Sequence, residues 1–178
     1  MRLLLQNKMA DKKMNTMREF KIDKLVLSCG GVKDVLEKEV KLLKKLSKKN
    51  PSIRKSMKRI PGFGVRPQLE VGCMVTLRGE EAVTLLKRFL AAIDNQLRKK
   101  QFADNHFSFG VKEYIEIPGE EYDREIGMMG FNVAVSFSRK GKRVSIRKIK
   151  QKSLPKKQIV TKDEIIKFMV EEFGTKIK

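Results

Sequence analysis

Two segments of the chain alternate apolar and polar residues with a period of two, which indicates β-strands with one buried and one open face. In the first, Leu69, Val71, Cys73, Val75 and Leu77 alternate with Glu70, Gly72, Met74 and Thr76. In the second, Phe131, Val133, Val135 and Phe137 alternate with Asn132, Ala134, Ser136 and Ser138. Half-buried strands are typical of antiparallel sheets covered on one face. The chain therefore needs helices to cover the apolar face.

Two helices are predicted to supply that cover. Residues 32–49 carry apolar residues at helical spacing, and Pro51 ends the segment because a residue before proline is pushed out of the α region. Residues 80–100 follow Gly79, with acids in the first turn and bases in the last. The two apolar stripes are Val32, Leu36, Val40, Leu43 and Leu46, and Ala82, Leu86, Phe89, Leu90, Ile93 and Leu97.

The remaining elements complete an α+β fold. Further strands are expected at residues 21–29, 52–59 and 109–117, and the strand at 52–59 should pair with the one at 69–77 as a long hairpin. A capping box from Thr161 to Glu164 opens a last helix that Gly174 can end. The predicted fold is a mostly antiparallel sheet with two main helices on one face, a long basic hairpin loop, and a C-terminal basic arm plus helix.

Three parts are expected along the chain. Residues 1–18 lack periodicity and should form a flexible extension, residues 19–138 the α+β domain, and residues 139–178 the arm and helix. Met9 resembles a second possible start, so residues 1–8 are expected to be an upstream start or a floppy extension. Leu3-Leu4-Leu5 is too short for the apolar region of a signal peptide.

The charge of the chain limits its partners. Its 178 residues include 41 Lys and Arg against 21 Asp and Glu, a net charge of +20. Self-repulsion of this size disfavours a compact free monomer, so a polyanionic partner is expected. An acidic membrane surface could also serve, but no apolar run approaches the roughly 20 residues that span a bilayer, and no membrane partner is predicted.

Two acid-free clusters concentrate the positive charge. Residues 51–68 hold five cations and, at a glycine-rich tip, Phe63, whose ring can pack on a sugar or base. Residues 139–157 hold ten Lys or Arg. Together the clusters predict two separated phosphate-binding sites on one small body.

Residues suited to catalysis or metal binding are sparse. His106 is the one histidine, which nearly excludes the usual catalytic triads, and a surface or partly packed ring is expected. Glu120 and Glu121 could do acid–base work, but adjacent acids in a loop are usually just solvated. Gly30-Gly31 lacks the other residues of a nucleotide-binding loop. No catalytic residue, metal or cofactor is therefore predicted.

Cys29 and Cys73 indicate the compartment. Each lies in a strand-like run and neither belongs to a CxxC pair, so buried free thiols are favoured over a disulfide. The chain is therefore predicted to be intracellular.

Four segments carry a family resemblance: KLVLSCGGVKDV (24–35), PSIRKSMKRIPGFGVRP (51–67), GCMVTLRGEE (72–81) and FSFGVKEYIEIPGEEYDREIGMMGFNV (107–133). In this order and spacing they resemble the large-subunit ribosomal protein family called protein five in bacteria and archaea and protein eleven in eukaryotic cytosolic ribosomes. The resemblance implies a structural protein, not an enzyme, that binds 5S rRNA in the central protuberance beside other 5S-binding proteins.

The resemblance also implies further partners. The hairpin loop should reach toward the P-site tRNA, and a neighbouring surface should bridge to a protein of the small-subunit head. The basic arm and capped helix look like the eukaryotic or archaeal branch, so a cytoplasmic ribosome is expected, with assembly in the nucleus or nucleolus if the source is eukaryotic.

Three groups of site residues follow. Contacts with 5S rRNA are expected at Ser28, Gly30, Gly31, Lys33, Arg54 and Lys55. The P-site tRNA loop comprises Lys58, Arg59, Ile60, Pro61, Gly62, Phe63, Gly64, Val65 and Arg66. The arm should meet large-subunit rRNA through Arg139, Lys140, Lys142, Arg143, Arg147, Lys148 and Lys150. The family usually has Asn at position 28 in a pattern like Asn-x-x-Val-Gly, whereas this chain has a serine and a double glycine.

Two alternatives stay open from the sequence. A non-ribosomal architectural protein would bind generic duplexes as well as it binds 5S rRNA. A basic RNA nuclease or transferase would lose activity on mutation of His106 or of the acids at residues 120–123.

Overall fold

The computed structural model describes Asn15 and residues 17–178. The two expected start sites and nearly all of the expected extension at residues 1–18 lie outside the described residues. The helices and strands, in chain order, are β1 (Phe20–Cys29), α2 (Asp34–Ser47), β2 (Ser52–Lys55), β3 (Glu70–Leu77), α3 (Glu80–Ala91), β4 (Gln96–Leu97), β5 (Phe102–Ala103), β6 (His106–Val111), β7 (Phe131–Arg139), α4 (Arg143–Ile146), α5 (Lys162–Phe173) and β8 (Lys176–Ile177). Short 3₁₀ helices lie at Pro61–Phe63, Lys99–Gln101, Tyr114–Glu116 and Lys156–Gln158.

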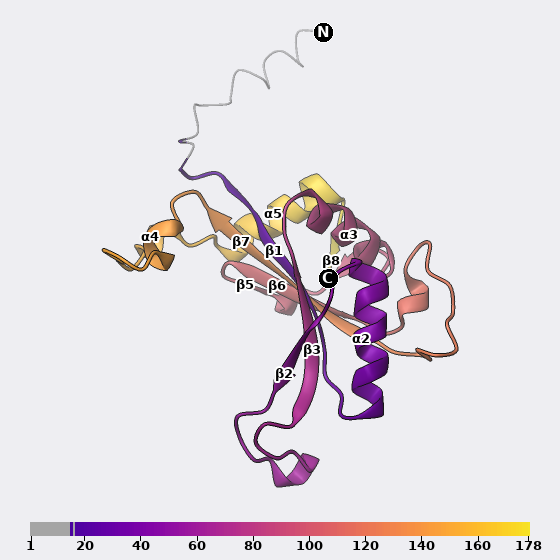
Figure 1. Ribbon diagram of the computed structural model, residues 1–178. Coiled ribbons are helices and arrows are strands. Elements are labelled where there is room, and N and C mark those ends of the chain that lie inside the picture. Colours follow the sequence, from indigo (N-terminus) through magenta and orange to yellow (C-terminus); the bar gives the residue numbers. More distant parts are fainter. Residues whose placement is uncertain (1–14, 16) are drawn as a thin grey trace, which may run out of the picture.

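A six-stranded sheet in the order β2-β3-β1-β7-β6-β5 forms the centre of the fold, and every neighbouring pair in it is antiparallel (Figure 1). Leu25 of β1 lies opposite Leu77 of β3 on one side and Val135 of β7 on the other. Directly opposed residues point to the same face, so apolar side chains from three strands form one continuous surface. The separate pair β4–β8 is parallel. The predicted mostly antiparallel α+β fold is confirmed.

Helices cover this apolar face of the sheet. Both α2 and α3 bury an apolar stripe against it, as predicted. Helix α5 packs there too, because the Phe168 ring lies 5.3 Å from that of Phe20 and 5.8 Å from that of Phe137. The buried helical side chains are Leu36, Leu42, Leu43 and Leu46 of α2, Ala82, Leu86, Phe89 and Leu90 of α3, and Ile165 and Met169 of α5.

Helix α2 is shorter than the predicted 32–49. Lys33 has a φ of 54° and Lys48 a φ of 55°, so both ends are set by left-handed residues. Val32 therefore lies outside the helix, and the fully buried Leu42 takes the place in the stripe that was predicted for the partly buried Val40.

Helix α3 ends at Ala91, and the predicted extension to residue 100 is wrong. Asp94 and Asn95 both have left-handed backbones, with φ of 54° and 55°. The chain then forms β4, whose Gln96 pairs with Lys176 near the end of the chain. A tertiary pairing thus overrides a helical pattern that continued through Leu97.

Two predicted strands are shorter or displaced. The strand expected at 52–59 is β2, which stops at Lys55, and the one expected at 109–117 is β6, which runs from His106 to Val111. The chain leaves the sheet after β6 because Tyr114 is fully buried in a 3₁₀ turn, where its hydroxyl accepts a hydrogen bond from the Asp123 N–H at 2.7 Å. His106 therefore lies at the exposed start of a strand, outside a loop.

Other local predictions hold. The Thr161 N–H donates to Glu164 Oε2 at 3.0 Å within the predicted capping box, and Gly174, with a φ of 62°, ends α5. Cys29 and Cys73 face each other across β1 and β3 as free thiols. Cys73 is buried as predicted, whereas Cys29 is only half-buried.

Candidate nucleic-acid interface

The sheet face opposite the helices, which we call the open face, carries mostly small or polar side chains. Successive residues of a strand point to opposite faces, and β1 has a register shift between Ile22 and Lys24, so even-numbered positions from Lys24 onward lie here. They are Lys24, Val26 and Ser28 of β1, Met74 and Thr76 of β3, His106 and Ser108 of β6, and Asn132, Ala134 and Ser136 of β7. These ten side chains are half-buried or exposed, and none of them is acidic. A polyanion that contacts them therefore meets no charge repulsion from these side chains.

Several predicted 5S contact residues meet at one end of the open face. Met74 on β3 lies opposite Ser28 on one side and Ser52 on the other. The Arg54 guanidinium lies against it, with Nη2 2.8 Å from Met74 Sδ. Ser28 and Arg54 thus lie on the same face, on either side of β3. Lys55 also lies on β2, 3.7 Å from the Glu70 carboxylate.

The double-glycine turn closes this end of the sheet. Gly72 of β3 lies so near it that a Cβ there would be 2.7 Å from the Cys29 carbonyl oxygen and 3.6 Å from the Gly30 Cα. Lys33 follows the turn and is exposed. The predicted residues Gly30, Gly31 and Lys33 therefore adjoin Ser28, and the backbone of the turn is not covered by side chains of its own.

A buried carboxyl group lies behind this turn. Glu39 of α2 is 5% exposed, and among the described residues its Oε2 has no hydrogen-bond partner. A Cβ at Gly31 would lie 3.0 Å from both Glu39 carboxylate oxygens, so the glycine makes room for this group. Burial raises the pKa of the Glu39 carboxyl above its ordinary value.

Glu39→Gln is expected to raise Tm at pH 7 by about 2 to 4 °C. The charged form is disfavoured only in the folded protein, so the free energy of unfolding falls as the pH rises through the ordinary pKa toward the raised one. Glutamine is neutral throughout, and its advantage should disappear below the ordinary value of 4.5. Thermal denaturation from pH 4 to pH 8 measures this, with the exposed Glu37→Gln as the control that should give no gain. A lower Tm for Glu39→Gln at pH 7 would contradict the assignment.

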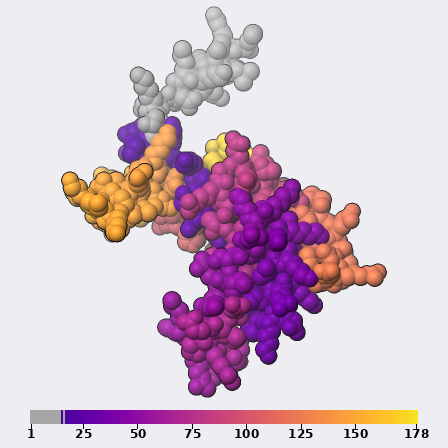
Figure 2. Space-filling view, viewed as in Figure 1, coloured from indigo at the N-terminus to yellow at the C-terminus, as the bar shows by residue number. Residues whose placement is uncertain are grey.

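The hairpin between β2 and β3 presents an exposed tip. The loop is closed by hydrogen bonds between Ile60 and Val65, and Gly64 adopts a left-handed φ of 64°. Phe63 is 82% exposed and Met57 is 92% exposed. The loop cations Lys58, Arg59 and Arg66 are exposed as well. Figure 2 shows this tip and the arm as two protruding lobes, at the bottom and the left of the view.

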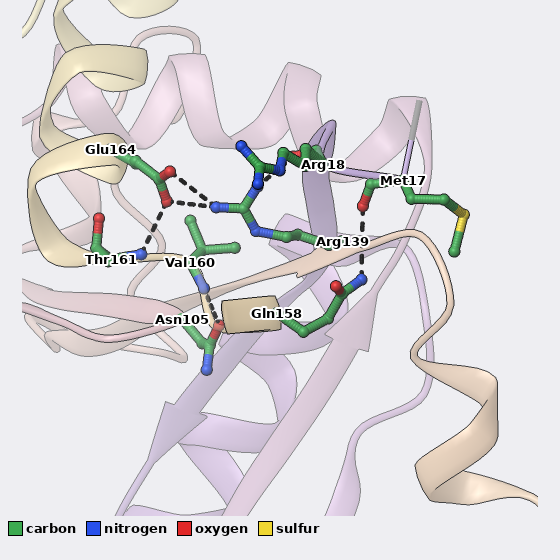
Figure 3. Close-up of polar contacts among 8 residues, drawn as sticks. All are labelled: Met17, Arg18, Asn105, Arg139, Gln158, Val160, Thr161 and Glu164. Atoms are coloured by element: carbon green, nitrogen blue, oxygen red, sulfur yellow. Dashed lines mark hydrogen bonds and ion pairs between the residues drawn. The ribbon is translucent and has the colours of Figure 1, made fainter. Parts of the chain in front are cut away.

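The root of the arm is fixed to the body by ion pairs (Figure 3). The Arg139 side chain is 8% exposed and donates to both carboxylate oxygens of Glu164, at 2.8 and 2.7 Å. Burial acts to raise the pKa of Glu164, but hydrogen bonds from Thr161 and Arg139 outweigh it and leave the pKa below its ordinary value. Glu164 is therefore ionised at neutral pH and joins the arm to the start of α5.

Two more arm lysines bind acids of the N-terminal strand region. Lys140 lies 2.7 Å from Glu19, and Lys142 lies 2.7 Å from Asp23. This anchoring could not be predicted from the sequence, because an acid-free run does not distinguish one arm cation from another. Of the seven predicted arm contacts, four remain exposed and without an ion pair among the described residues: Arg143, Arg147, Lys148 and Lys150.

The acidic loop after β6 lies on the helical side of the molecule. Arg88 of α3 bonds Glu120 at 2.8 Å, and Lys41 of α2 bonds Glu125 at 2.7 Å. Glu120 and Glu121 were both expected to be solvated. Glu121 is exposed, whereas Glu120 forms an ion pair with Arg88. The acidic loop thus lies on the side away from the open face, and the hairpin loop at residues 56–68 contains no acid.

The described residues offer little else for chemistry. They contain no group of three or more His, Cys, Asp or Glu side chains placed to hold a metal ion. None of the helices in residues 17–178 is long and apolar enough to cross a membrane. His106 is exposed, and its Nδ1 lies 3.0 Å from the Asp104 carbonyl oxygen.

Comparison with known proteins gives a consistent result. The model of the ribosomal L5P family C-terminus matches residues 70–168. The chain is similar to the large ribosomal subunit protein uL5 of Nanoarchaeum equitans, with 39% identity over 164 residues that cover 90% of this chain and 97% of the relative. The corresponding protein of Sulfolobus acidocaldarius is 39% identical over 170 residues, covering 93% and 95%. That of Pyrobaculum aerophilum is 37% identical over 168 residues, covering 93% and 94%. The chain therefore belongs to the ribosomal L5P family.

Proposed function

We propose that this chain binds 5S rRNA in the central protuberance of the large ribosomal subunit, beside a neighbouring 5S-binding protein. As a member of the ribosomal L5P family it is a structural, non-enzymatic protein of the large subunit, with rRNA as its general partner and the ribosome as its location. The same proposal has the hairpin reach the P-site tRNA and a neighbouring surface contact a small-subunit head protein. The ribosome would be cytoplasmic, and in a eukaryotic source the subunit would be assembled in the nucleus or nucleolus. The chain would consist of an extension up to residue 18, an α+β domain up to residue 138, and the arm with its helix.

The gathering of predicted contact residues at one end of the open face is the observation that supports the proposal most. Ser28 and Arg54 lie there on either side of β3, beside the Gly30-Gly31 turn, and the acidic loop that binds Lys41 and Arg88 lies on the opposite, helical side. Backbone amides at the glycines can approach RNA closely, and Arg54 can neutralise a phosphate. A rigid sheet of this kind selects RNA by shape and by unpaired segments, since A-form RNA hides the base edges of its major groove.

Competition binding tests the 5S assignment. The full chain is bound to labelled 5S rRNA at fixed salt and challenged with unlabelled 5S rRNA or with a generic RNA duplex of equal length. Unlabelled 5S rRNA is expected to displace the labelled RNA at a much lower concentration than the generic duplex does. Equal competition by the two RNAs would favour the architectural-protein alternative.

Arg59→Ala combined with Arg66→Ala is expected to weaken binding of the hairpin to tRNA by about tenfold, since each removed phosphate contact lowers affinity severalfold near physiological salt. Both side chains are exposed, so Tm should stay unchanged. Binding of P-site tRNA to reconstituted large subunits measures the first effect, and thermal denaturation the second. The matched control replaces the exposed Lys87 and Lys167 of the helical side. A fall in Tm of the hairpin variant would show that the loop is structural.

A further inference from the structure

A cavity of about 260 Å³ opens at the root of the arm, between the open face and the segment that leads into α5. Its lining from the open face includes Lys24, His106 and Ser136, and Leu154 and Ile159 line it from the C-terminal segment. It lies apart from the Gly30-Gly31 end of the sheet and from the hairpin tip.

The wall of the cavity is rigid where Asn105 forms it. The Asn105 N–H donates to the Val160 carbonyl at 3.0 Å, and its own carbonyl accepts from the Phe137 N–H at 2.7 Å. The side-chain Oδ1 accepts from the Val160 N–H at 2.8 Å. This fixes the amide, and Figure 3 shows its nitrogen directed away from Val160. Asn105 therefore offers a donor that is already held in place, which lowers the entropy cost of binding.

The cavity offers both donors and acceptors. A backbone carbonyl can only accept, so the contact with Asp104 places the proton of a neutral His106 ring on Nδ1 and leaves Nε2 as an acceptor. The Ser136 hydroxyl can donate or accept. Lys142 is held by Asp23, whereas Lys24 makes no ion pair with the described residues. No carboxylate of the described residues lines the cavity, so an anion that enters it is attracted by Lys24.

We propose that this cavity receives one unpaired nucleotide of the bound RNA, an inference that rests on the proposed function. The apolar side chains Leu154 and Ile159 would contact the face of the base, and the polar groups of Asn105, His106 and Ser136 would bond its edge. The phosphate would lie toward Lys24. The cavity has room for a single base, and only an unpaired base is free to leave its helix and enter it, so the site favours single-stranded RNA.

His106 makes the test direct, because it is the only histidine of the chain. Its ring signal is followed by NMR in the full-length protein during titration with a hexa-adenylate single strand or with an RNA duplex carrying the same number of phosphates. The signal is expected to shift with the single strand and to stay in place with the duplex. Ser136→Leu, which fills the cavity without changing charge, should abolish the shift and lower single-strand affinity about tenfold.

Thr84→Leu is the matched control, since Thr84 is exposed on α3, on the helical side, and does not line the cavity. It should leave both the shift and the affinity unchanged. Leu154→Glu, at a half-buried position, gives a second variant that should weaken binding by placing a carboxylate in the wall. An unmoved His106 signal, or equal affinity of the wild type and both cavity variants, would overturn the inference. The outcome is separate from that of the 5S competition. 5S rRNA can bind while the cavity stays empty, and the cavity can bind a single strand even if 5S rRNA is not preferred.

Discussion

Gly130→Ala is expected to destabilise the protein by about 3 kcal/mol, the upper end of what an added methyl group costs in a packed site. A Cβ at Gly130 would lie 2.4 Å from the Lys112 carbonyl oxygen and 2.7 Å from that of Val111. Both atoms belong to the backbone at the end of β6, so they cannot move away as a flexible side chain can. The strands must separate where Val111 pairs with Phe131, and both of these side chains are buried.

Thermal denaturation should show a Tm lower by about 6 to 12 °C for Gly130→Ala, because 1 kcal/mol shifts Tm by roughly 2 to 4 °C in a chain of this size. Gly62→Ala at the hairpin tip is the control, since a Cβ there meets no atom of the described residues within 4 Å. Its Tm should stay within about 1 °C of the wild type. Equal Tm values for the two variants would mean that the end of β6 yields to the added methyl group.

The sheet could be predicted from the sequence because its signal is local. The alternation around Val75 and Val133 places these side chains on one face by strand geometry alone, and both are buried as expected. The capping box at Thr161 is local in the same sense. The end of α3 is different, since it depends on the pairing of Gln96 with Lys176. The residues near Gln96 contain no pattern that predicts pairing with a segment so distant in the sequence.

The candidate interface divides in the same way. Acid-free runs pointed to the hairpin and the arm, but composition could not distinguish Arg139, which is buried against Glu164, from the exposed Arg147. The partner of Arg139 lies 25 residues away, and only the docking of α5 brings it near. The position of Ser28 and Arg54 on either side of Met74 likewise depends on strand register, which the resemblance implied only as a list of residues.

The exposed arm cations should dominate the salt dependence of RNA binding. Replacing Arg143, Arg147, Lys148 and Lys150 by alanine is expected to make the slope of log affinity against log salt shallower by about 3, since each neutralised phosphate contributes about 0.7 to 0.9. Near physiological salt the same contacts correspond to a loss of about 10²- to 10³-fold in affinity for large-subunit rRNA. The fold should survive, because these side chains are exposed and the ion pairs of Arg139, Lys140 and Lys142 are left intact.

A control with the same change in net charge separates local contacts from overall attraction. Lys38, Lys44, Lys87 and Lys167 are exposed on the helices and make no ion pair with the described residues. Replacing these four by alanine lowers the charge equally, so a long-range field would affect both variants alike, whereas direct phosphate contacts would affect the arm variant alone. Filter binding from 50 to 300 mM salt gives both slopes. Equal slopes for the two variants would exclude the arm as an RNA contact, because charge removed from the helical side would then have weakened binding as much as charge removed from the arm.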